Sequence, residues 1–311
     1  MKILVTNIGR RIYFAQFLVD LKKKIKNCKI YLADNNLNVS GLKINGARVL
    51  KIPKVEDGNN KYLKALKKII IDKKISILIP CTNYDLNILS LSVDKIKKLG
   101  CHIMVSNNSL INKCLDKKKL FDLSLKYNFY SPKIFFNLKE AKKSKTKVFI
   151  RKLRNGYASI GQKVIKKLEN KDFKKNYIIQ EYIYGDEFHL DILNDHNGKF
   201  LSSSLKKKIS MRYGETDIAK VVNNHKINIL SKKLSKHLKH IGNLDCDIIY
   251  DKRKKVPYII DINPRFGGGY AFTHISGENF LAKYIYNFIG KKIKNKKKIS
   301  NKIYSKGIAL A

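Results

Sequence analysis

Short apolar runs alternate with amphipathic helical stretches through the first 108 residues of this 311-residue chain, and this alternation limits the fold more than any other feature. The run at 75–80, ISILIP, is apolar throughout, which is typical of a strand covered on both faces. The other runs of this kind are KILVT (2–6), KIYLA (29–33), RVLKI (48–52) and CHIMVS (101–106). Strands that alternate with helices favour a parallel, doubly wound sheet. We therefore predict an α/β domain over residues 1–108.

A parallel sheet of this kind can bind a dinucleotide at its first strand-to-helix turn, which here reads TNIGRR. The turn has one glycine, Gly9, where the dinucleotide fingerprint needs three. Asn7, Arg10 and Arg11 follow the first strand, at the edge where open sheets bind ligands. The sequence therefore argues against an NAD site and makes Arg10 a candidate substrate-binding residue, although a charged loop is the plainer interpretation.

Three polar side chains share one face of a predicted hairpin formed by residues 245–251 and 256–263. Asp247 and Asp261 lie on its two strands, and Asn263 points to the same face because it follows Asp261 by two residues. Carboxylate and amide oxygens suit Mg²⁺, which shares its coordination sphere with phosphates. We predict a magnesium site at these three residues, with Mn²⁺ as the alternative ion.

Arg265 continues this face by the same alternation, and the glycine run Gly267, Gly268 and Gly269 follows it. A guanidinium group can pair with a phosphoryl group, and glycines let a substrate approach the main chain closely. The plainer interpretation is a strand that ends in polar caps and a turn. The motif therefore needs support from other segments.

A second segment points to phosphate binding. Lys152 lies in a predicted strand, 147–153, and precedes a loop of small residues that contains Gly156, Ser159 and Gly161. The backbone N–H groups of such a loop can hold a phosphate together with the lysine. The segment is not a P-loop, because the lysine comes before the glycines.

The stretch IIQEYIYGDEFHLDIL predicts an edge strand, a turn and a second strand. Glu181 and the main chain of Tyr182 and Ile183 are suited to bind an adenine, and Glu187 is suited to bind ribose hydroxyls.

Basic residues occur at even spacing on a further predicted strand, where Lys206, Lys208 and Arg212 would face one site. The chain has a net charge of +42, but only eight of its 66 basic residues are arginine, and the lysines are spread along the whole chain. Arginine is the preferred side chain for reading guanine and clamping phosphates. The composition therefore indicates a solvated lysine-rich surface and argues against a nucleic-acid-binding protein.

The chain has no apolar run near the roughly 18 residues that a membrane span needs, and its start does not have the pattern of a signal peptide. The five cysteines are scattered and form no CxxC pair. We expect reduced thiols, no membrane partner and a cytoplasmic location.

Six motifs in their order along the chain give a resemblance to a known family. They are LIPCTNYDLNIL (78–89), DKKKLFDLSLKYNFYSPKIF (116–135), the Lys152 loop, IIQEYIYGDEFHLDIL, KKKISMRYGET and IIDINPRFGGGY. The chain resembles the ATP-grasp ligases, in particular the short carbamoyl-phosphate-synthase-like members. The resemblance implies an α/β domain over 1–108, a small lobe or lid over 109–180, and a C-terminal lobe with the magnesium site over 181–311.

The resemblance also implies roles for single residues. Lys152 would contact ATP phosphates beneath the loop 156–161, and Arg265 would stabilise the transferring phosphoryl group. Lys206 and Arg212 would face phosphate or substrate as further catalytic residues. Glu181, Tyr182, Ile183 and Glu187 would hold the nucleoside, and Asp247, Asp261 and Asn263 the metal. The family usually has Glu at Asp261 and Gln or Glu at Asp247, so both carboxylates are shorter here.

The implied function is ATP-dependent ligation, in which a carboxylate becomes an acyl phosphate and then reacts with an amine. We expect the substrate near Gly267, Gly268, Tyr270, Thr273 and His274. The substrates would be small molecules of the amino-acid or sugar-acid type, used for a peptide-like metabolite or a surface polysaccharide, and a homodimer is compatible with the sequence. The alternatives are a carbamoyl-phosphate-synthase-like kinase or carboxylase subunit, an NAD-binding oxidoreductase and a nucleic-acid-binding protein.

Overall fold

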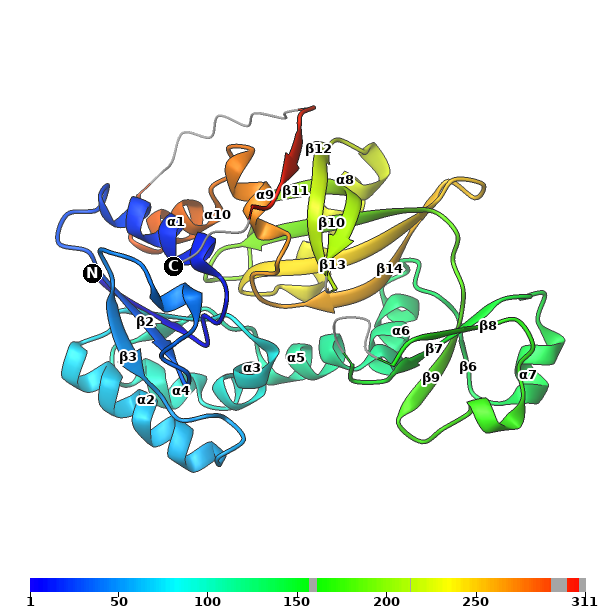
Figure 1. The fold of residues 1–311 in the computed structure, drawn as a ribbon, viewed down its shortest axis with the longest axis horizontal. Coiled ribbons are helices and arrows are strands. Elements are labelled where there is room, and N and C mark those ends of the chain that lie inside the picture. Colours follow the sequence, from blue (N-terminus) through cyan, green and yellow to red (C-terminus); the bar gives the residue numbers. More distant parts are fainter. Residues whose placement is uncertain (157–160, 213, 292–300, 308–311) are drawn as a thin grey trace.

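The computed structural model describes residues 1–156, 161–212, 214–291 and 301–307. Within them the chain forms three sheets, which we call the N-terminal sheet (β1–β5), the small sheet (β6–β9) and the large sheet (β10–β15). In Figure 1 the N-terminal sheet lies on the left, the small sheet on the right, and the large sheet above and between them. The predicted combination of a parallel sheet with two further α+β units is confirmed.

The N-terminal sheet is parallel, with strand order β3-β2-β1-β4-β5. Its strands are β1 (Lys2–Thr6), β2 (Lys29–Asp34), β3 (Arg48–Lys51), β4 (Ile77–Pro80) and β5 (His102–Ile103). Its connections contain α1 (Ile12–Lys22), the 3₁₀ turn η1 (Ser40–Leu42), α2 (Asn59–Lys73), α3 (Asn83–Ser90) and α4 (Val93–Lys97). All five predicted strands of this sheet are present, and their apolar runs place side chains on both faces.

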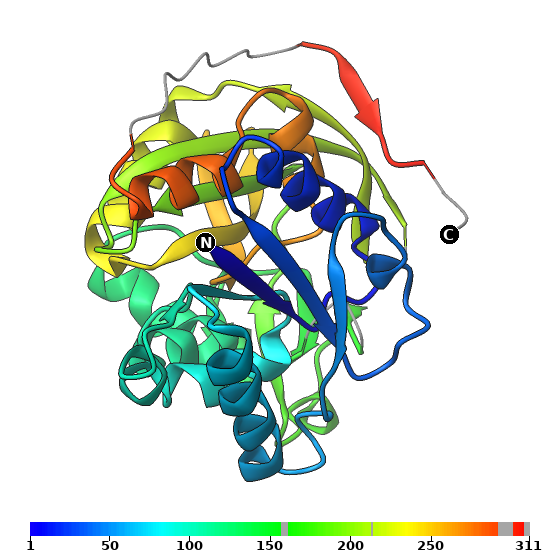
Figure 2. The ribbon, with the colours of Figure 1, turned by 90° about the vertical axis from the view of Figure 1, so that its left-hand side faces the viewer.

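The two faces of this sheet are covered by helices from opposite ends of the chain. Alternation along β1 sends Ile3 and Val5 to one core and Leu4 to the other. The core at Ile3 is filled by α1 and by α10 (Phe280–Phe288), whereas α2 and α3 cover the opposite face. Figure 2 shows α1 and α10 on one side of the sheet and α2 on the other. A helix from the last third of the chain therefore completes the core of the first.

The small sheet is antiparallel, with strand order β6-β9-β7-β8. Its elements are β6 (Ile134–Phe135), α7 (Leu138–Lys143), β7 (Phe149–Leu153), β8 (Lys163–Ile165), the 3₁₀ turn η2 (Asn170–Asp172) and β9 (Tyr177–Glu181). Two helices, α5 (Asn108–Leu115) and α6 (Lys117–Lys126), lie before the small sheet in the chain. The chain bends at Asp116, whose carboxylate accepts hydrogen bonds from Lys118 N and Lys119 N at the start of α6.

The large sheet has strand order β14-β13-β10-β11-β12-β15 and is antiparallel. Its elements are β10 (Asp186–Asn194), β11 (Phe200–Arg212), β12 (Glu215–Val222), α8 (His225–Leu238), β13 (Gly242–Asp251), β14 (Val256–Asn263), α9 (Tyr270–Ile275) and β15 (Ile303–Ser305). Apolar residues of β10 and β13, such as Leu190, Ile192 and Leu244, share a core with Leu230 and Leu234 of α8. The residues between them in sequence point to the opposite face, which carries the charged side chains considered below.

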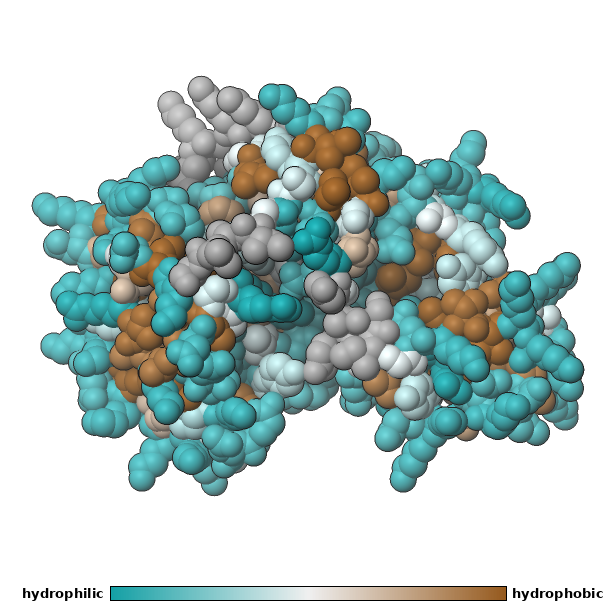
Figure 3. Space-filling view, viewed as in Figure 1, coloured by the Kyte–Doolittle hydropathy of each residue, from teal (hydrophilic) through white to brown (hydrophobic). Residues whose placement is uncertain are grey.

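The surface seen in Figure 3 is mostly hydrophilic, and its hydrophobic residues form separate patches rather than one continuous face. In the described part of the chain, none of the helices has the length and apolar character that a membrane crossing requires.

Candidate active site

A cavity of about 610 Å³ lies where the three sheets meet. The N-terminal sheet contributes Arg11 and Asn83 to its lining, and the region of the small sheet contributes Asn155 and Gly156. The large sheet and the loop after it contribute Lys208, Glu215 and the acidic and glycine residues of β13, β14 and the following turn. On the charged face of the large sheet, His189, Lys208, Asp245, Asp247 and Asp261 line this cavity, and Asp191 lies beside His189.

The predicted metal ligands are brought together on the cavity wall. Asp247 on β13 and Asp261 on β14 lie directly opposite each other in the hairpin, and Asn263 lies opposite Asp245. The Nζ atom of Lys208 lies 2.6 Å from Asp247 Oδ1. Two adjacent carboxylates with an amide oxygen form a donor set of hard oxygens, which fits Mg²⁺.

The electrostatics keep this donor set charged. Burial by itself would raise the pKa of Asp247, but the positive charges of Lys208 and His189 outweigh burial and hold the pKa below its usual value. Asp261 receives a weaker contact from Lys117, whose Nζ lies 3.8 Å from Asp261 Oδ1. Asp247 is therefore an anion at neutral pH and is available to a cation.

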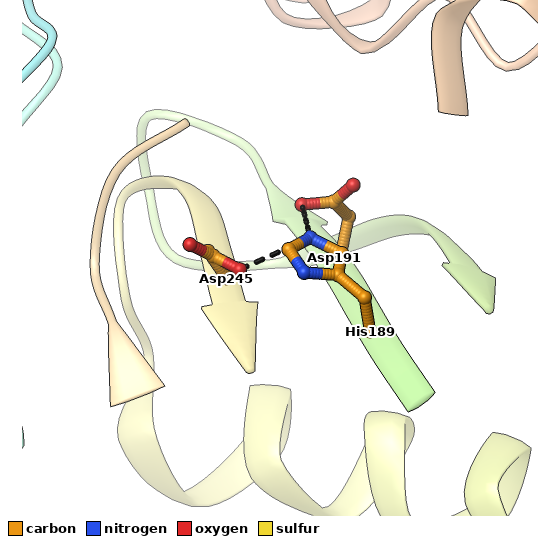
Figure 4. A group of neighbouring side chains, drawn as sticks. All are labelled: His189, Asp191 and Asp245. Carbon is orange, nitrogen blue, oxygen red and sulfur yellow. Dashed lines mark hydrogen bonds and ion pairs between the residues drawn. The ribbon is translucent and has the colours of Figure 1, made fainter. Parts of the chain in front are cut away.

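Beside the metal ligands lies a buried group of His189, Asp191 and Asp245, shown in Figure 4, of which His189 and Asp245 also line the cavity. The Nε2 atom of His189 is 3.0 Å from Asp245 Oδ1 and 3.4 Å from Asp191 Oδ1. Burial would lower the pKa of His189, but Asp245 and Asp191 raise it to about 9. A protonated imidazole has no lone pair to give to a metal. This group is therefore an ion-pair cluster next to the metal ligands, in which His189 compensates the charges of Asp191 and Asp245.

Arg265 is held in place by partners from two sheets. Its Nε donates to Asn83 Oδ1 at 2.7 Å, and its Nη1 donates to the main-chain oxygen of Phe266 at 3.0 Å and lies 3.4 Å from Asp245 Oδ2. Asn83 in turn donates from Nδ2 to Asn263 Oδ1 at 2.8 Å. One asparagine at the start of α3 thus positions both the guanidinium and a predicted metal ligand.

Two lysines approach the acidic wall from the side of the small sheet. Lys152 on β7 is buried, and its pKa is lowered by burial and by the charge of Lys117, against the attraction of Asp261 and Asp247. Lys117 is buried as well and donates from Nζ to the main-chain oxygen of Gly156 at 2.6 Å. Two cations held this close favour a ligand with several negative charges between them.

The remaining predicted phosphate-loop and nucleoside residues lie at the edge of this arrangement. Ser159 is outside the described residues, and Gly161 has a φ of +69°, a conformation that favours glycine. The Glu181 carboxylate accepts from Lys133 N at 3.0 Å, and Tyr182 N donates to Val148 O at 3.0 Å.

The adenine and ribose roles predicted for Glu181, Tyr182, Ile183 and Glu187 stay predictions. Glu181 ends β9, Tyr182 and Ile183 follow it in the connection to β10, and Glu187 lies in β10; none of the four lines the cavity. Glu187 is half-exposed, and its Oε2 lies 3.6 Å from Lys208 Nζ.

The structure corrects the predicted basic row on β11. Lys206 is fully buried, and its Nζ lies 2.5 Å from Asp191 Oδ2 and 2.6 Å from Thr273 Oγ1, so it pairs inside the protein instead of facing phosphate. Register shifts between Lys208 and Ser210 and between Ser210 and Met211 then change the alternation. Met211 lines the cavity as a result, whereas Arg212 is exposed and pairs with Asp217 at 3.3 Å.

The predicted substrate residues of α9 are also corrected. Tyr270 is fully buried in the core beneath α1, and its hydroxyl accepts from Leu281 N at 3.1 Å. His274 stacks on Phe17 of α1, with ring centroids 3.5 Å apart. These contacts fix α9 to the N-terminal sheet, and neither residue lines the cavity. Arg10 is exposed and lies outside the lining, which contains its neighbour Arg11 instead.

The glycine run has a different reason from the predicted one. A Cβ atom at Gly267 would lie 2.0 Å from Asp245 Oδ2, and one at Gly269 would lie 2.5 Å from the ring of His189. A Cβ at Gly268 would meet only the end of the Glu215 side chain, at 3.0 Å. Gly267 and Gly269 therefore make room for the protein's own charged cluster, and Gly268, which lines the cavity together with Gly269, is the better match to the expected substrate contact.

Several site residues are missing from the sequence prediction. Asp245 carries the same signal as Asp247, since it lies two positions earlier on the same strand. Lys117 is hidden by the lysine-rich sequence around it. Asn83 has no local signal, because its partners lie far away in the chain. Arg11 shares its signal, a place after the first strand, with Arg10, and the sequence does not tell which of the two lines the cavity.

Comparisons with known proteins agree with this arrangement. Residues 112–269 match the model of the ATP-grasp domain, and residues 3–104 match the PylC-like N-terminal domain. Among curated proteins, none matches the sequence significantly.

Similar solved structures include the ADP complex of purK, N5-carboxyaminoimidazole ribonucleotide synthetase. It has 14% sequence identity and a TM-score of 0.72, and the alignment covers 96% of this chain and 79% of that one. Biotin carboxylase from Campylobacter jejuni has 15% identity and a TM-score of 0.72, with 96% and 73% covered. The L-amino acid ligase from Bacillus licheniformis has 15% identity and a TM-score of 0.64, with 92% and 73% covered. At these identities the likeness shows a common fold, whereas the ATP-grasp domain model itself matches more than half of the chain. The chain therefore belongs to the ATP-grasp family, as its motifs predict.

Proposed function

We propose that this protein is an ATP-dependent carboxylate–amine ligase that uses Mg²⁺. In this reaction the γ-phosphoryl group of ATP passes to a carboxylate, and an amine then displaces phosphate from the resulting acyl phosphate. The proposal rests on the ATP-grasp family and on the side chains that line the cavity.

One observation carries the proposal. A set of hard oxygen ligands, Asp247, Asp261 and Asn263, lies beside an arginine with fixed orientation and two buried lysines. Such a combination suits a polyphosphate with a divalent cation better than it suits a nicotinamide cofactor or a neutral metabolite.

The side chains divide the work of phosphoryl transfer. Lys152 and Lys117 are placed to hold the phosphates of ATP, and Arg265 is placed to neutralise charge on the group in transfer. Asp247, Asp261 and Asn263 would hold Mg²⁺, which screens phosphate charge when it is bound. The nucleoside would be bound at the end of β9 and the start of β10, by Glu181, Tyr182, Ile183 and Glu187.

A trapping assay tests the proposal without knowledge of the amine. Hydroxylamine reacts with acyl phosphates, so Mg-ATP, hydroxylamine and one carboxylic acid at a time should give a hydroxamate and phosphate for the correct acid. The acids to screen are amino acids, sugar acids and dicarboxylates. Asp261→Ala combined with Asn263→Ala should abolish the product. The proposal fails if the wild-type chain binds no Mg-ATP, or if this double variant turns over as fast as the wild type.

A further inference from the structure

Arg11 lies on the cavity wall that belongs to the N-terminal sheet, and the proposed phosphoryl transfer gives it no role. Its Nε atom is buried and makes no hydrogen bond with any of the residues that the structure describes, although the guanidinium group interacts with the side chains of Tyr13 and Glu215. A buried N–H group without a partner costs free energy, and a bound ligand, an ion or a water molecule can satisfy it. The surroundings of Arg11 therefore indicate what that ligand is.

The surroundings are positive on one side. Arg11 and Arg265 line the same cavity, and the charge of Arg11 adds to burial in lowering the pKa of Arg265, against the attraction of Asp245. Helix α1 begins directly after Arg11 and has neither a side-chain cap nor an acidic residue in its first turn. Two like charges beside an uncapped helix start favour an anion between them.

A carboxylate lies close to this positive group. Glu215, at the start of β12, lines the same cavity and is one of the charges that act on Arg11. Its side chain is half-exposed and lies against Gly268, and Lys306 contacts its Oε2 at 3.3 Å. An anion site and a cation site therefore adjoin each other at the end of the cavity.

This pair of sites is separate from the metal ligands. The cations that act most strongly on Asp247 are Lys208 and His189, whereas Arg11 acts on Arg265. Arg265 connects the two groups: it contacts Asp245, shares Asn83 with the predicted ligand Asn263, and lines the same cavity as Arg11. The carboxylate that receives the phosphoryl group must lie at the metal side, so the group held by Arg11 belongs to the second substrate.

We propose that the amine substrate is an α-amino acid, whose carboxylate binds to Arg11 and whose ammonium group faces Glu215. This inference rests on the proposed ligase function. The amine nitrogen forms a bond to the acyl carbon, and the bond from that carbon to the phosphate oxygen breaks. Of the two protons that the ammonium loses, one leaves on the phosphate and the other passes by way of the Glu215 carboxylate to solvent.

The test separates activation of the acid from capture of the amine. Hydroxylamine carries no carboxylate and needs no Arg11, so it reports the first step alone. With the acid found by the hydroxamate screen, we would measure amide formation with L- and D-amino acids, with their amides and with simple alkylamines. Arg11→Gln should leave hydroxamate formation within about twofold of the wild type. It should raise KM for the amino acid by roughly 10- to 100-fold, the usual effect of losing a charge-assisted hydrogen bond.

Arg10→Gln is the matched control, because Arg10 is adjacent in sequence but exposed and outside the cavity lining. It should behave as the wild type in both assays. The amides and alkylamines should be poor substrates for the wild type and should not distinguish Arg11→Gln from it.

Three results would overturn the inference while the ligase function stands. The first is hydroxamate formation by the wild type without amide formation from any amino acid. The second is an unchanged KM for the amino acid in Arg11→Gln. The third is loss of hydroxamate formation in that variant, which would show that Arg11 binds the acid and not the amine. Absence of any hydroxamate in the wild type would instead count against the ligase function itself.

Discussion

The buried pair of Lys206 and Asp191 provides the clearest test of the structure against the sequence, because the sequence places Lys206 at the phosphates. We consider the change Lys206→Met, which keeps most of the length and removes the charge. Asp191 would keep hydrogen bonds from Thr273 and Asn243, at 2.6 and 2.9 Å, but would lose its cation at 2.5 Å.

The expected cost follows from the burial of both partners, whose side chains are fully inaccessible to solvent. Breaking a buried pair by removing one partner costs about 3–5 kcal/mol, since the remaining charge is uncompensated. The lower end of this range is expected here, because the imidazole of His189 stays 3.4 Å from Asp191. The comparable change Arg212→Met removes an exposed pair with Asp217 and should cost only about 0–1 kcal/mol.

Denaturant unfolding followed by circular dichroism measures this difference directly. Lys206→Met should unfold at a clearly lower denaturant concentration than Arg212→Met, and Asp191→Asn in the same chain should restore part of the loss. The reasoning would be refuted if Lys206→Met were as stable as the wild type yet lost hydroxamate formation. That result would return Lys206 to the catalytic role that the sequence predicts.

Three further predictions concern the cavity wall. The pKa of His189 is raised from 6.5 to about 9, so the stability that its charge contributes is fully present below pH 6.5 and is lost as the pH rises towards 9. The difference in unfolding free energy between the wild type and His189→Gln, measured in the presence of a chelator, should therefore shrink between pH 6.5 and 9. A difference that grows over this interval would contradict the ion pairing of His189 with the two aspartates. Asp261→Asn removes a negative charge from the predicted metal site, so it should raise the Mg²⁺ concentration needed for half-maximal phosphate release and slow turnover about 100-fold or more. An unchanged dependence of phosphate release on Mg²⁺ would exclude Asp261 as a ligand. Gly269→Ala should destabilise the protein by about 1–3 kcal/mol, because the new Cβ atom meets the His189 ring. Gly268→Ala should lower the melting temperature less, because its Cβ atom meets only the flexible Glu215 side chain. Equal losses of thermal stability would contradict this explanation of the glycine run.

The sequence predicts the elements that depend on local pattern. The five strands of the N-terminal sheet and the hairpin with Asp247 and Asp261 follow from apolar runs and alternation, and the structure contains them. The start of α6 also has a local cause, since Asp116 caps it by accepting from Lys118 N.

The missed features depend on contacts between distant segments. The shifts in register along β11 have no sequence signal, so alternation from Lys206 to Arg212 fails there. The choice of Arg11 over Arg10, and the contact of Asn83 with Arg265, are decided by how the sheets pack. Gly267 and Gly269 are explained only when Asp245 and His189 are placed beside them.

The helix α10 has a consequence for the synthesis of the chain. Phe280, Leu281 and Ile285 fill the same core as Ile3 and Val5, so this face of the first sheet is covered only in part, by α1, until residues 280–288 have left the ribosome. A nascent N-terminal region would therefore expose apolar surface through most of translation, which makes it a target for chaperones and prone to aggregation. The first sheet to be synthesised is thus completed by one of the last helices. Truncation before residue 280 should therefore yield an insoluble product even though all five strands are present.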